Sequence, residues 1–540
     1  MKAIEATGTV NSQGQLFLDE PLKIESDRRV RVIVLMAEDL ETDPDDDPIE
    51  FVREGIRQGW HEARTGQTYP IQQFQIQNLT RVPPSHRIKE GVCERLDMNP
   101  QSLSFGVLLR FLQSAIAQVK DPRQPSNATQ YSLKDAFLGA FSVFFMQCES
   151  FLEHQRQMQS RHGRDNAQSL FGLEQIPTHP QIRNILDHTA AQSLFSVFGW
   201  VYQALLRSGY LQPYRCLDGH LLVALDGCQY FSSLKLHCEQ CSSRTHKDGH
   251  ISYFHSAILP VIVAPQQTEV ISLAPEFITP QDGSEKQDCE VAAAKRWITT
   301  HTPDFVGQSI TFLGDDLYSH QPMAEHCLNL GMNFIFTCLP DSHKTLYERL
   351  SKLEETGEVK ALELKKSNKR TQEIHQYRYV NEISLRNTQP ALSVNWCEVT
   401  ITRQSDGKLL YHNAFTTRHD LSDETVVDVV SAGRSRWKTE NENHNILKTK
   451  GYHLEHSFGH GQHHLSQVLL TLNLIAFLFH TVLQWVDKPY QQIRQQRGTR
   501  KGFFGDILSL TKYLLFDNWE QLLGFMLSKA PKTPPKANSS

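Results

Sequence analysis

Apolar runs of strand length within residues 221–340 constrain the fold of this chain more than any other feature. Five such runs occur, at 221–227, 253–265, 268–278, 309–315 and 333–340. The first three follow one another without a helical pattern between them, whereas helical segments at 286–301 and 321–331 separate the later ones. Strands that first form a meander and then alternate with helices predict a mixed sheet in an α/β fold.

Composition and pattern divide the rest of the chain around this region. The 540 residues are enough for about three to four domains. Residues 1–36 alternate apolar and polar side chains as strands do, and an acidic linker and a short helix follow. We predict four parts: a small β module with its linker at 1–73, a helical domain at 74–210, an α/β domain at 211–490 with a β-rich insertion at about 371–417, and basic helices with a disordered tail at 491–540.

Charge is unevenly distributed, which matters for the choice of partner. The net charge is −5, but residues 1–73 hold 8 Lys and Arg against 15 Asp and Glu. The remaining residues hold 47 against 45 and include basic runs at 365–370 and 494–501. Since the acidity belongs to one end, the overall charge does not exclude a DNA-binding protein.

Cysteine content and one long apolar segment bear on the cellular location. Ten cysteines in a chain without a secretory leader predict reduced thiols and a cytoplasmic protein. Residues 468–486 are long enough to span a bilayer but contain Asn473, His480 and Gln484. We therefore expect a buried core helix and no membrane partner.

A short segment of the helical domain has two interpretations. Residues 176–187 open with a Pro-Thr turn and continue as a helix that carries Gln181 and Arg183. This helix could read DNA as the second helix of a helix-turn-helix, with Arg183 as a contact residue. It could equally be an ordinary packing helix.

Two aspartates stand at the ends of apolar strands. Asp226 is followed directly by Gly227, and Asp315 follows Gly314. An acidic residue at the carboxyl end of a buried strand meets solvent at the edge of the sheet, where α/β folds place their sites. One such residue is commonly a turn or cap, but two on neighbouring strands favour a site for a divalent cation that takes oxygen ligands.

A third acidic residue lies in a charged segment, 434–461. If this segment is helical, Arg436, Glu440, His444 and Lys448 recur every four residues on one face. A carboxylate flanked by cations suits a metal-bound phosphodiester, since the acid holds metal and the cations hold phosphate. The alternative is a solvated amphipathic helix with pairs four residues apart.

Three segments together resemble a known family. They are LDGCQYFSS around Asp226, FLGDDLYSH around Asp315 and RWKTENENHNILK around Glu440. In this order they resemble the acidic motifs of DDE transposases of bacterial insertion sequences, in particular the group with a Tyr-Arg-Glu-Lys signature. The spacings of 89 and 125 residues are similar, and the second leaves room for the β-rich insertion. The resemblance covers about residues 100–490, whereas residues 1–70 resemble small antitoxins of bacterial toxin–antitoxin pairs and suggest a fusion.

The chain departs from the family pattern near the third acid. Gly433 stands where the signature tyrosine would be, and Lys448 follows Glu440 by eight residues instead of seven. Two neighbouring acids compete for places in the triad. Tyr318 has the expected spacing to Asp315, which favours that residue over Asp316, and the Arg-Trp context favours Glu440 over Glu442.

The resemblance implies a ribonuclease-H-like fold with a catalytic triad of Asp226, Asp315 and Glu440. The triad would bind two Mg²⁺ (or Mn²⁺) ions about 3.5–4 Å apart. The expected activity is cutting and joining double-stranded DNA, at transposon ends and target, by a nucleoid-associated homodimer with Arg436 and Lys448 as DNA contacts. The alternatives are a non-catalytic regulator fused to an antitoxin-like module and a nuclease of the same fold.

Two groups of metal-ligating side chains remain outside this triad. Cys238 and Cys241 stand in C-x-x-C spacing and are followed by several histidines, which predicts a structural Zn²⁺ site or, alternatively, a polar β-hairpin beside the active site. A second group of histidines follows the third acid and is interpreted as DNA-proximal or locally hydrogen-bonded. The members of the two groups are His237, His246, His250 and His255, and then His453, His456, His460, His463 and His464.

Overall fold

A computed structural model of the chain describes residues 103–124, 130–160, 162–280, 288–367, 372–456 and 458–528, and two short strands near the N-terminus. The chain divides into two compact units, Met1–Leu79 and Thr80–Ser540. In the first unit, β1 (Gly8–Val10) and β2 (Leu16–Leu18) pair antiparallel. The acidic linker and short helix predicted within residues 1–73 lie outside the described residues, as does the tail from residue 529.

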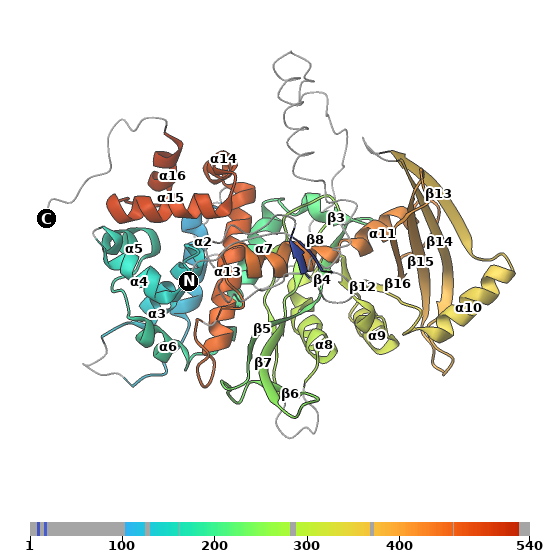
Figure 1. Ribbon diagram of the computed structural model, residues 1–540, viewed down its shortest axis with the longest axis horizontal. Coiled ribbons are helices and arrows are strands. Elements are labelled where there is room, and N and C mark those ends of the chain that lie inside the picture. Colours follow the sequence, from blue (N-terminus) through green and yellow to red (C-terminus); the bar gives the residue numbers. More distant parts are fainter. Residues whose placement is uncertain are drawn as a thin grey trace, which may run out of the picture. The chain divides into compact units, whose positions relative to one another are not determined.

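A ten-stranded mixed sheet, the central sheet, extends from β4 and β8 in the middle of the view to β13 and β14 at its right-hand end (Figure 1). Its order is β13-β14-β15-β16-β12-β11-β4-β8-β9, with β3 beside β4. Strands β4, β11 and β12 are parallel neighbours, and the strands on either side of them pair antiparallel. The predicted mixed α/β fold is confirmed. The bounds are β3 (Arg215–Cys216), β4 (His220–Ala224), β8 (Val261–Val263), β9 (Ile271–Ser272), β11 (Ile310–Gly314), β12 (Asn333–Thr337), β13 (Lys360–Ser367), β14 (Gln372–Ser384), β15 (Ser393–Arg403) and β16 (Leu409–Thr417).

A smaller sheet continues from the central one. It has the order β10-β7-β5, with β6 paired to β7. Its strands are β5 (Gly227–Ser233), β6 (Ser242–Thr245), β7 (Ile251–Ile258) and β10 (Glu276–Ile278). Only Leu225 and Asp226 separate the end of β4 from the start of β5, and the backbone N–H of Leu259 donates to the carbonyl of Asp226 over 3.1 Å. Asp226 therefore lies at the junction of the two sheets.

The strand-rich segment begins earlier than the expected 371 and belongs to the central sheet. Strands β13 to β16 pair antiparallel, and β16 then pairs with β12 through Ile335 and Thr417. The edge strand β13 is mostly exposed and rich in charged side chains. Because it has few apolar residues, its sequence pattern did not predict a strand. Helix α10 (Lys344–Glu355) connects β12 to this part of the sheet.

Helices from both ends of the second unit share one core around α13 (Leu465–Val486) (Figure 1). Aromatic contacts join the helices before the sheet to those after it. The ring centres of Phe105 and Trp519 are 4.8 Å apart, and those of Phe141 and Phe479 are 5.5 Å apart. The helices of this core are α2 (Phe105–Ala117), α3 (Leu133–Phe145), α4 (Phe151–Gln159), α5 (Gly163–Phe171), α6 (His179–Leu186), η3 (Ala191–Leu194), α7 (Ser196–Arg207), η4 (Gln212–Tyr214), α14 (Lys488–Arg497), α15 (Arg500–Tyr513) and α16 (Trp519–Leu527).

Helix α13 is the long apolar segment that the sequence singled out. Of its most apolar 18-residue window, 94% is buried inside the protein. Its polar side chains have partners in the core: Asn473 donates to the carbonyl of Tyr452 over 2.8 Å, and His480 lies 2.7 Å from the Tyr452 hydroxyl. The prediction of a buried core helix is confirmed.

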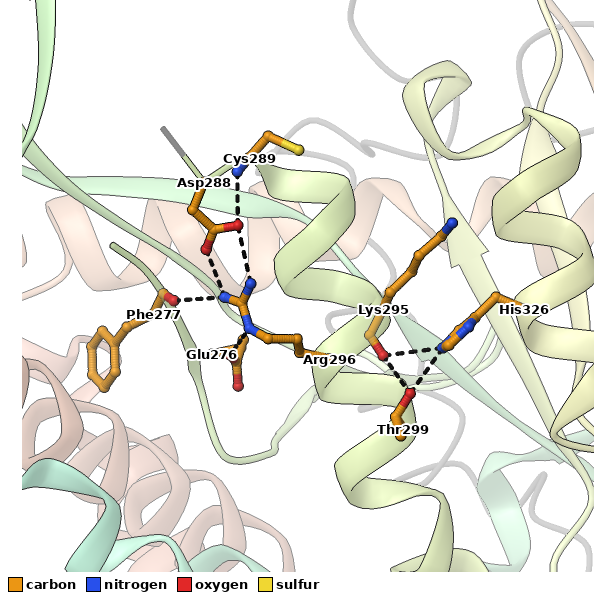
Figure 2. A network of polar contacts seen from close by, with 8 residues as sticks. All are labelled: Glu276, Phe277, Asp288, Cys289, Lys295, Arg296, Thr299 and His326. Carbon is orange, nitrogen blue, oxygen red and sulfur yellow. Dashed lines mark hydrogen bonds and ion pairs between the residues drawn. The ribbon is translucent and has the colours of Figure 1, made fainter. Parts of the chain in front are cut away.

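The remaining helices precede or follow strands of the central sheet. Helix α8 (Glu290–His301) and η5 (Thr302–Phe305) precede β11, η6 (Asp316–Tyr318) and α9 (Gln321–Asn329) lead to β12, and α11 (Val426–Arg434), the π-helix η7 (Thr439–His444) and α12 (Asn445–Thr449) follow β16. Helices α8 and α9 are joined by a 3.0 Å contact between Thr299 and His326 (Figure 2).

Candidate active site

The two aspartates predicted at strand ends lie on neighbouring parallel strands. In the register of β4 and β11, Ala224 pairs with Leu313, and the N–H of Leu225 donates to the carbonyl of Leu313 over 2.9 Å. Asp226 and Asp315 follow these positions at the same edge of the sheet. This is the arrangement that the apolar runs led us to expect.

The third acid reaches this edge on the segment that follows α11. Arg436 donates to Glu440 over 2.8 Å, and the same guanidinium nitrogen lies 4.0 Å from a carboxylate oxygen of Asp226. The ring of His444 lies 3.8 Å from that oxygen. Arg436, Glu440 and His444 therefore face Asp226, as their spacing of four residues predicts. The helix is not a regular α-helix there, because 439–444 form a π-helix, a form frequent at functional sites.

Carboxylates crowd around Asp226, whose side chain is only 17% exposed. Burial raises the pKa of Asp226 to about 7; Arg436 opposes this shift, and the neighbouring carboxylates Glu290, Glu440 and Asp315 add to it. Four acidic side chains within electrostatic reach of one another repel, so this edge of the sheet favours a cation.

The structure distinguishes the paired acids in the sequence. Asp316 points away from Asp226: its carboxylate accepts from the N–H of Leu339 over 2.7 Å and from the hydroxyl of Ser342. Asp315 accepts from the N–H of Leu317 over 2.9 Å and acts on Asp226. Its position therefore favours Asp315 over Asp316.

Glu440 contacts Arg436 over 2.8 Å and acts electrostatically on Asp226. Glu442 lies two residues further along the same π-helix and is half-buried. The geometry therefore favours Glu440 as the third acid of the cluster.

Glu290, the first residue of α8, is a fourth carboxylate that the sequence analysis missed. It accepts from the N–H of Gly227 over 3.2 Å and from the Tyr318 hydroxyl over 2.8 Å. A Cβ atom on Gly227 would lie 2.4 Å from a Glu290 oxygen, so a larger residue directly after Asp226 would displace the Glu290 carboxylate from this position. The sequence analysis considered Tyr318 only for its spacing to Asp315. Because a buried tyrosine hydroxyl needs a hydrogen-bond partner, Tyr318 was the one residue that could have indicated a further polar side chain at the site.

A polar network fixes the start of α8 and hence Glu290 (Figure 2). Arg296 donates two hydrogen bonds to Asp288, of 3.0 and 2.7 Å, and one of 2.9 Å to Glu276 of β10. The Asp288 carboxylate also accepts from the N–H of Cys289 over 2.9 Å. These bonds hold the residues just before Glu290 against the smaller sheet.

Besides Arg436, the two other cations predicted to contact DNA, Lys448 and Arg183, have protein partners. Lys448 is exposed and forms a 3.0 Å ion pair with Glu455, which raises the pKa of the lysine. Arg183 is half-buried, with its guanidinium 5.9 Å from the centre of the Phe151 ring, and burial lowers its pKa. Their roles in DNA binding remain predictions.

Helix α6, which carries Arg183, has a clear packing role. The Asp187 carboxylate at its end accepts hydrogen bonds from the N–H groups of Gln462, His463 and Leu465, at 2.9, 3.0 and 3.0 Å. These bonds cap the N-terminus of α13. The packing interpretation of this helix therefore has direct structural support, and the DNA-reading interpretation stays a prediction.

Gly433, which stands in place of a signature tyrosine, is tightly packed. A Cβ atom there would lie 2.9 Å from side-chain atoms of Ile335 on β12 and of Phe415 on β16. Helix α11 can approach the sheet this closely only with a glycine at the contact. The fold therefore leaves no room at position 433 for a tyrosine side chain.

The structure selects four side chains from the two Cys and His groups. Cys238, Cys241, His255 and His460 have ligand atoms that all lie within 4.8 Å of one another. His255 comes from the first group and His460 from the second. Other members point elsewhere; for example, His246 bonds Ser252 over 2.8 Å.

No protein-family model matches the sequence, and no curated protein matches it. Function is therefore inferred from the geometry of the site.

Proposed function

We propose that this chain is a metal-dependent DDE transposase that cuts and joins double-stranded DNA. The observation that carries the proposal is the meeting of Asp226, Asp315 and Glu440 at one edge of a mixed sheet. A ribonuclease-H-like fold is supported by the strand order around β4, which has antiparallel neighbours on one side and two parallel strands on the other.

The residues at this edge fit a pair of hard divalent cations. Carboxylate oxygens are the ligands that Mg²⁺ and Mn²⁺ take in proteins. A cation would stabilise the charged form of Asp226, whose pKa is raised mainly by burial and further by Glu290, Glu440 and Asp315. Asp226, Asp315 and Glu440 would hold the ions. When bound, two such ions supply a nucleophile at neutral pH and stabilise the attacking and leaving oxygens of a phosphodiester.

The protein's own side chains position the carboxylates. Arg436 holds Glu440 through a 2.8 Å hydrogen bond and lies between it and Asp226. Burial lowers the pKa of His444 to about 4, so its ring is neutral at pH 7 and adds no charge beside Asp226. Arg436 would then offer its remaining donors to a DNA phosphate, and Lys448 would do so after leaving Glu455.

The proposed substrates are the DNA ends of a mobile element and a target duplex, bound by a homodimer. The purified chain should be incubated with labelled DNA from either side of its reading frame, with Mg²⁺, Mn²⁺ or EDTA. We expect metal-dependent nicks at defined positions, followed by products joined to a second duplex. Cleavage without joining would indicate a nuclease, and sequence-specific binding without cleavage would indicate a non-catalytic regulator.

A further inference from the structure

Four metal-ligating side chains meet away from the carboxylates. Cys238 and Cys241 lie in the connection between β5 and β6, His255 lies on β7, and His460 lies in the loop before α13. His255 is 1% exposed and Cys241 is 7% exposed. The cluster therefore connects the smaller sheet to the loop that leads into the helical core. Two of its side chains are buried and two are half-buried.

Five of the six distances between the ligand atoms match a tetrahedron around one ion, and the sixth, from Cys238 to His460, is within 4.8 Å. A zinc ion bound at typical bond lengths sets its ligand atoms about 3.8 Å apart for two sulfurs, about 3.6 Å for sulfur and nitrogen and about 3.4 Å for two nitrogens. The observed distances are 3.9 Å for Cys238 to Cys241, 3.6 Å for Cys238 to His255, 3.4 Å for Cys241 to His255, 3.3 Å for Cys241 to His460 and 3.2 Å for His255 to His460. Each agrees with the tetrahedral value to within about 0.3 Å.

The histidine rings present the correct atoms. Both turn Nε2 into the cluster. Nδ1 of His460 lies 2.8 Å from the carbonyl oxygen of Gly461, and since a carbonyl only accepts, that nitrogen carries the hydrogen. The Nε2 atom of a neutral His460 then has a free lone pair directed at the cluster. A ligand histidine held by a carbonyl at its other nitrogen is the usual outer shell of a zinc site.

We propose that Cys238, Cys241, His255 and His460 bind one structural Zn²⁺ ion. Four protein ligands complete the tetrahedron and leave no position for water or substrate, so the site stabilises structure and performs no chemistry. The two sulfurs are 3.9 Å apart, whereas a disulfide requires about 2.05 Å. The two thiols are therefore not joined in a disulfide.

The placement of the ion gives it a definite role. Strand β5, which leads to Cys238 and Cys241, begins directly after Asp226. The loop of His460 follows the segment that carries Glu440. The same loop is fixed on its other side by Asp187. The ion therefore clamps together the two parts of the chain that supply the first and third carboxylates. The proposal concerns metal content and does not depend on catalysis.

The test is the zinc content of the full-length chain, purified without chelators. We expect one zinc per chain, and we expect Cys238→Ser, Cys241→Ser, His255→Asn and His460→Asn each to lower zinc affinity by about 100-fold or more, because even outer-shell changes cost 10–100-fold. The matched controls His237→Asn and Cys289→Ser change neighbouring or exposed residues outside the cluster and should keep the metal.

A second measurement guards against variants that fail to fold. Wild-type protein loaded with Co²⁺ should show the visible absorption of tetrahedral cobalt with a thiolate charge-transfer band. Chelation of the zinc should also lower the melting temperature, since the ion binds the folded chain. Wild-type protein that holds neither zinc nor cobalt overturns the proposal. So does zinc retained by the ligand variants, or an equal loss from the controls.

Discussion

The contact between Tyr318 and Glu290 gives a quantitative test of the site's architecture. Tyr318 is fully buried, and its hydroxyl donates to Glu290 over 2.8 Å. Tyr318→Phe removes this one bond and leaves the ring in place. A hydrogen bond to a charged group contributes about 1.5–3 kcal/mol. Because Glu290 is half-buried and keeps the bond from Gly227, we expect a loss near the lower end, about 1.5–2 kcal/mol.

Urea denaturation followed by circular dichroism measures this loss, with Tyr513→Phe as control because Tyr513 is 50% exposed. A double-mutant cycle with Glu290→Ala isolates the pair and should give a coupling energy of about 1 kcal/mol or more. If Tyr318→Phe costs less than about 0.5 kcal/mol, as surface changes do, or if the coupling is near zero, Glu290 is not held by Tyr318 as described.

Three further predictions follow from packing, burial and domain division. Gly433→Tyr should destabilise the protein by about 3 kcal/mol or more, because even a Cβ atom overlaps Ile335 and Phe415; a soluble variant with an unchanged denaturation midpoint would contradict this. His154 is buried, which lowers its pKa to about 3, so protons bind the unfolded chain more tightly and stability is lost as pH falls below about 6.5. His154→Gln should therefore reduce the slope of stability against pH between pH 6 and 4 by about 1.4 kcal/mol per unit, and an unchanged slope would refute the burial argument. A chain that starts near Phe74 should still cut and join DNA in the gel assay, because the first compact unit ends at Leu79; a folded but inactive truncation would show that the front end is part of the enzyme.

The apolar strands and the helices between residues 221 and 340 could be predicted because burial on both faces leaves long apolar runs. Strands β5 and β6, which are only partly buried, were not predicted. The run at 253–265 nevertheless divides between two sheets. It breaks at Leu259 and Pro260, where the N–H of Leu259 turns to the carbonyl of Asp226 and Pro260 has no N–H to donate. Periodicity describes one strand and carries no information about which partner each half will pair with.

The candidate site could be predicted in part for a similar reason. Asp226 and Asp315 could be identified because each follows an apolar strand. Arg436 and Glu440 could be paired because they are four residues apart in one helical segment. Glu290 belongs to a different helix and reaches the site only through tertiary contacts.

The metal cluster shows the same limit. His460 is 219 residues from Cys241, with which it makes contact. Local spacing identified the C-x-x-C pair, and neighbouring histidines such as His246 and His250 competed for the remaining positions. The fold decides between them, since it brings β7 and the loop before α13 to the same point.

Variants that remove the charge of one carboxylate test most directly whether Asp226, Asp315 and Glu440 form one metal-dependent catalytic site. The measurement is the rate of DNA strand cleavage. Asp226→Asn, Asp315→Asn and Glu440→Gln should each bind end DNA but lower the Mg²⁺-dependent cleavage rate by about 1000-fold or more, since about 4 kcal/mol of transition-state stabilisation is lost with a metal ligand. Glu442→Gln is the matched control on the same π-helix and should cleave at close to the wild-type rate. Cleavage retained by any of the three variants, or abolished by Glu442→Gln and not by Glu440→Gln, would contradict the assignment.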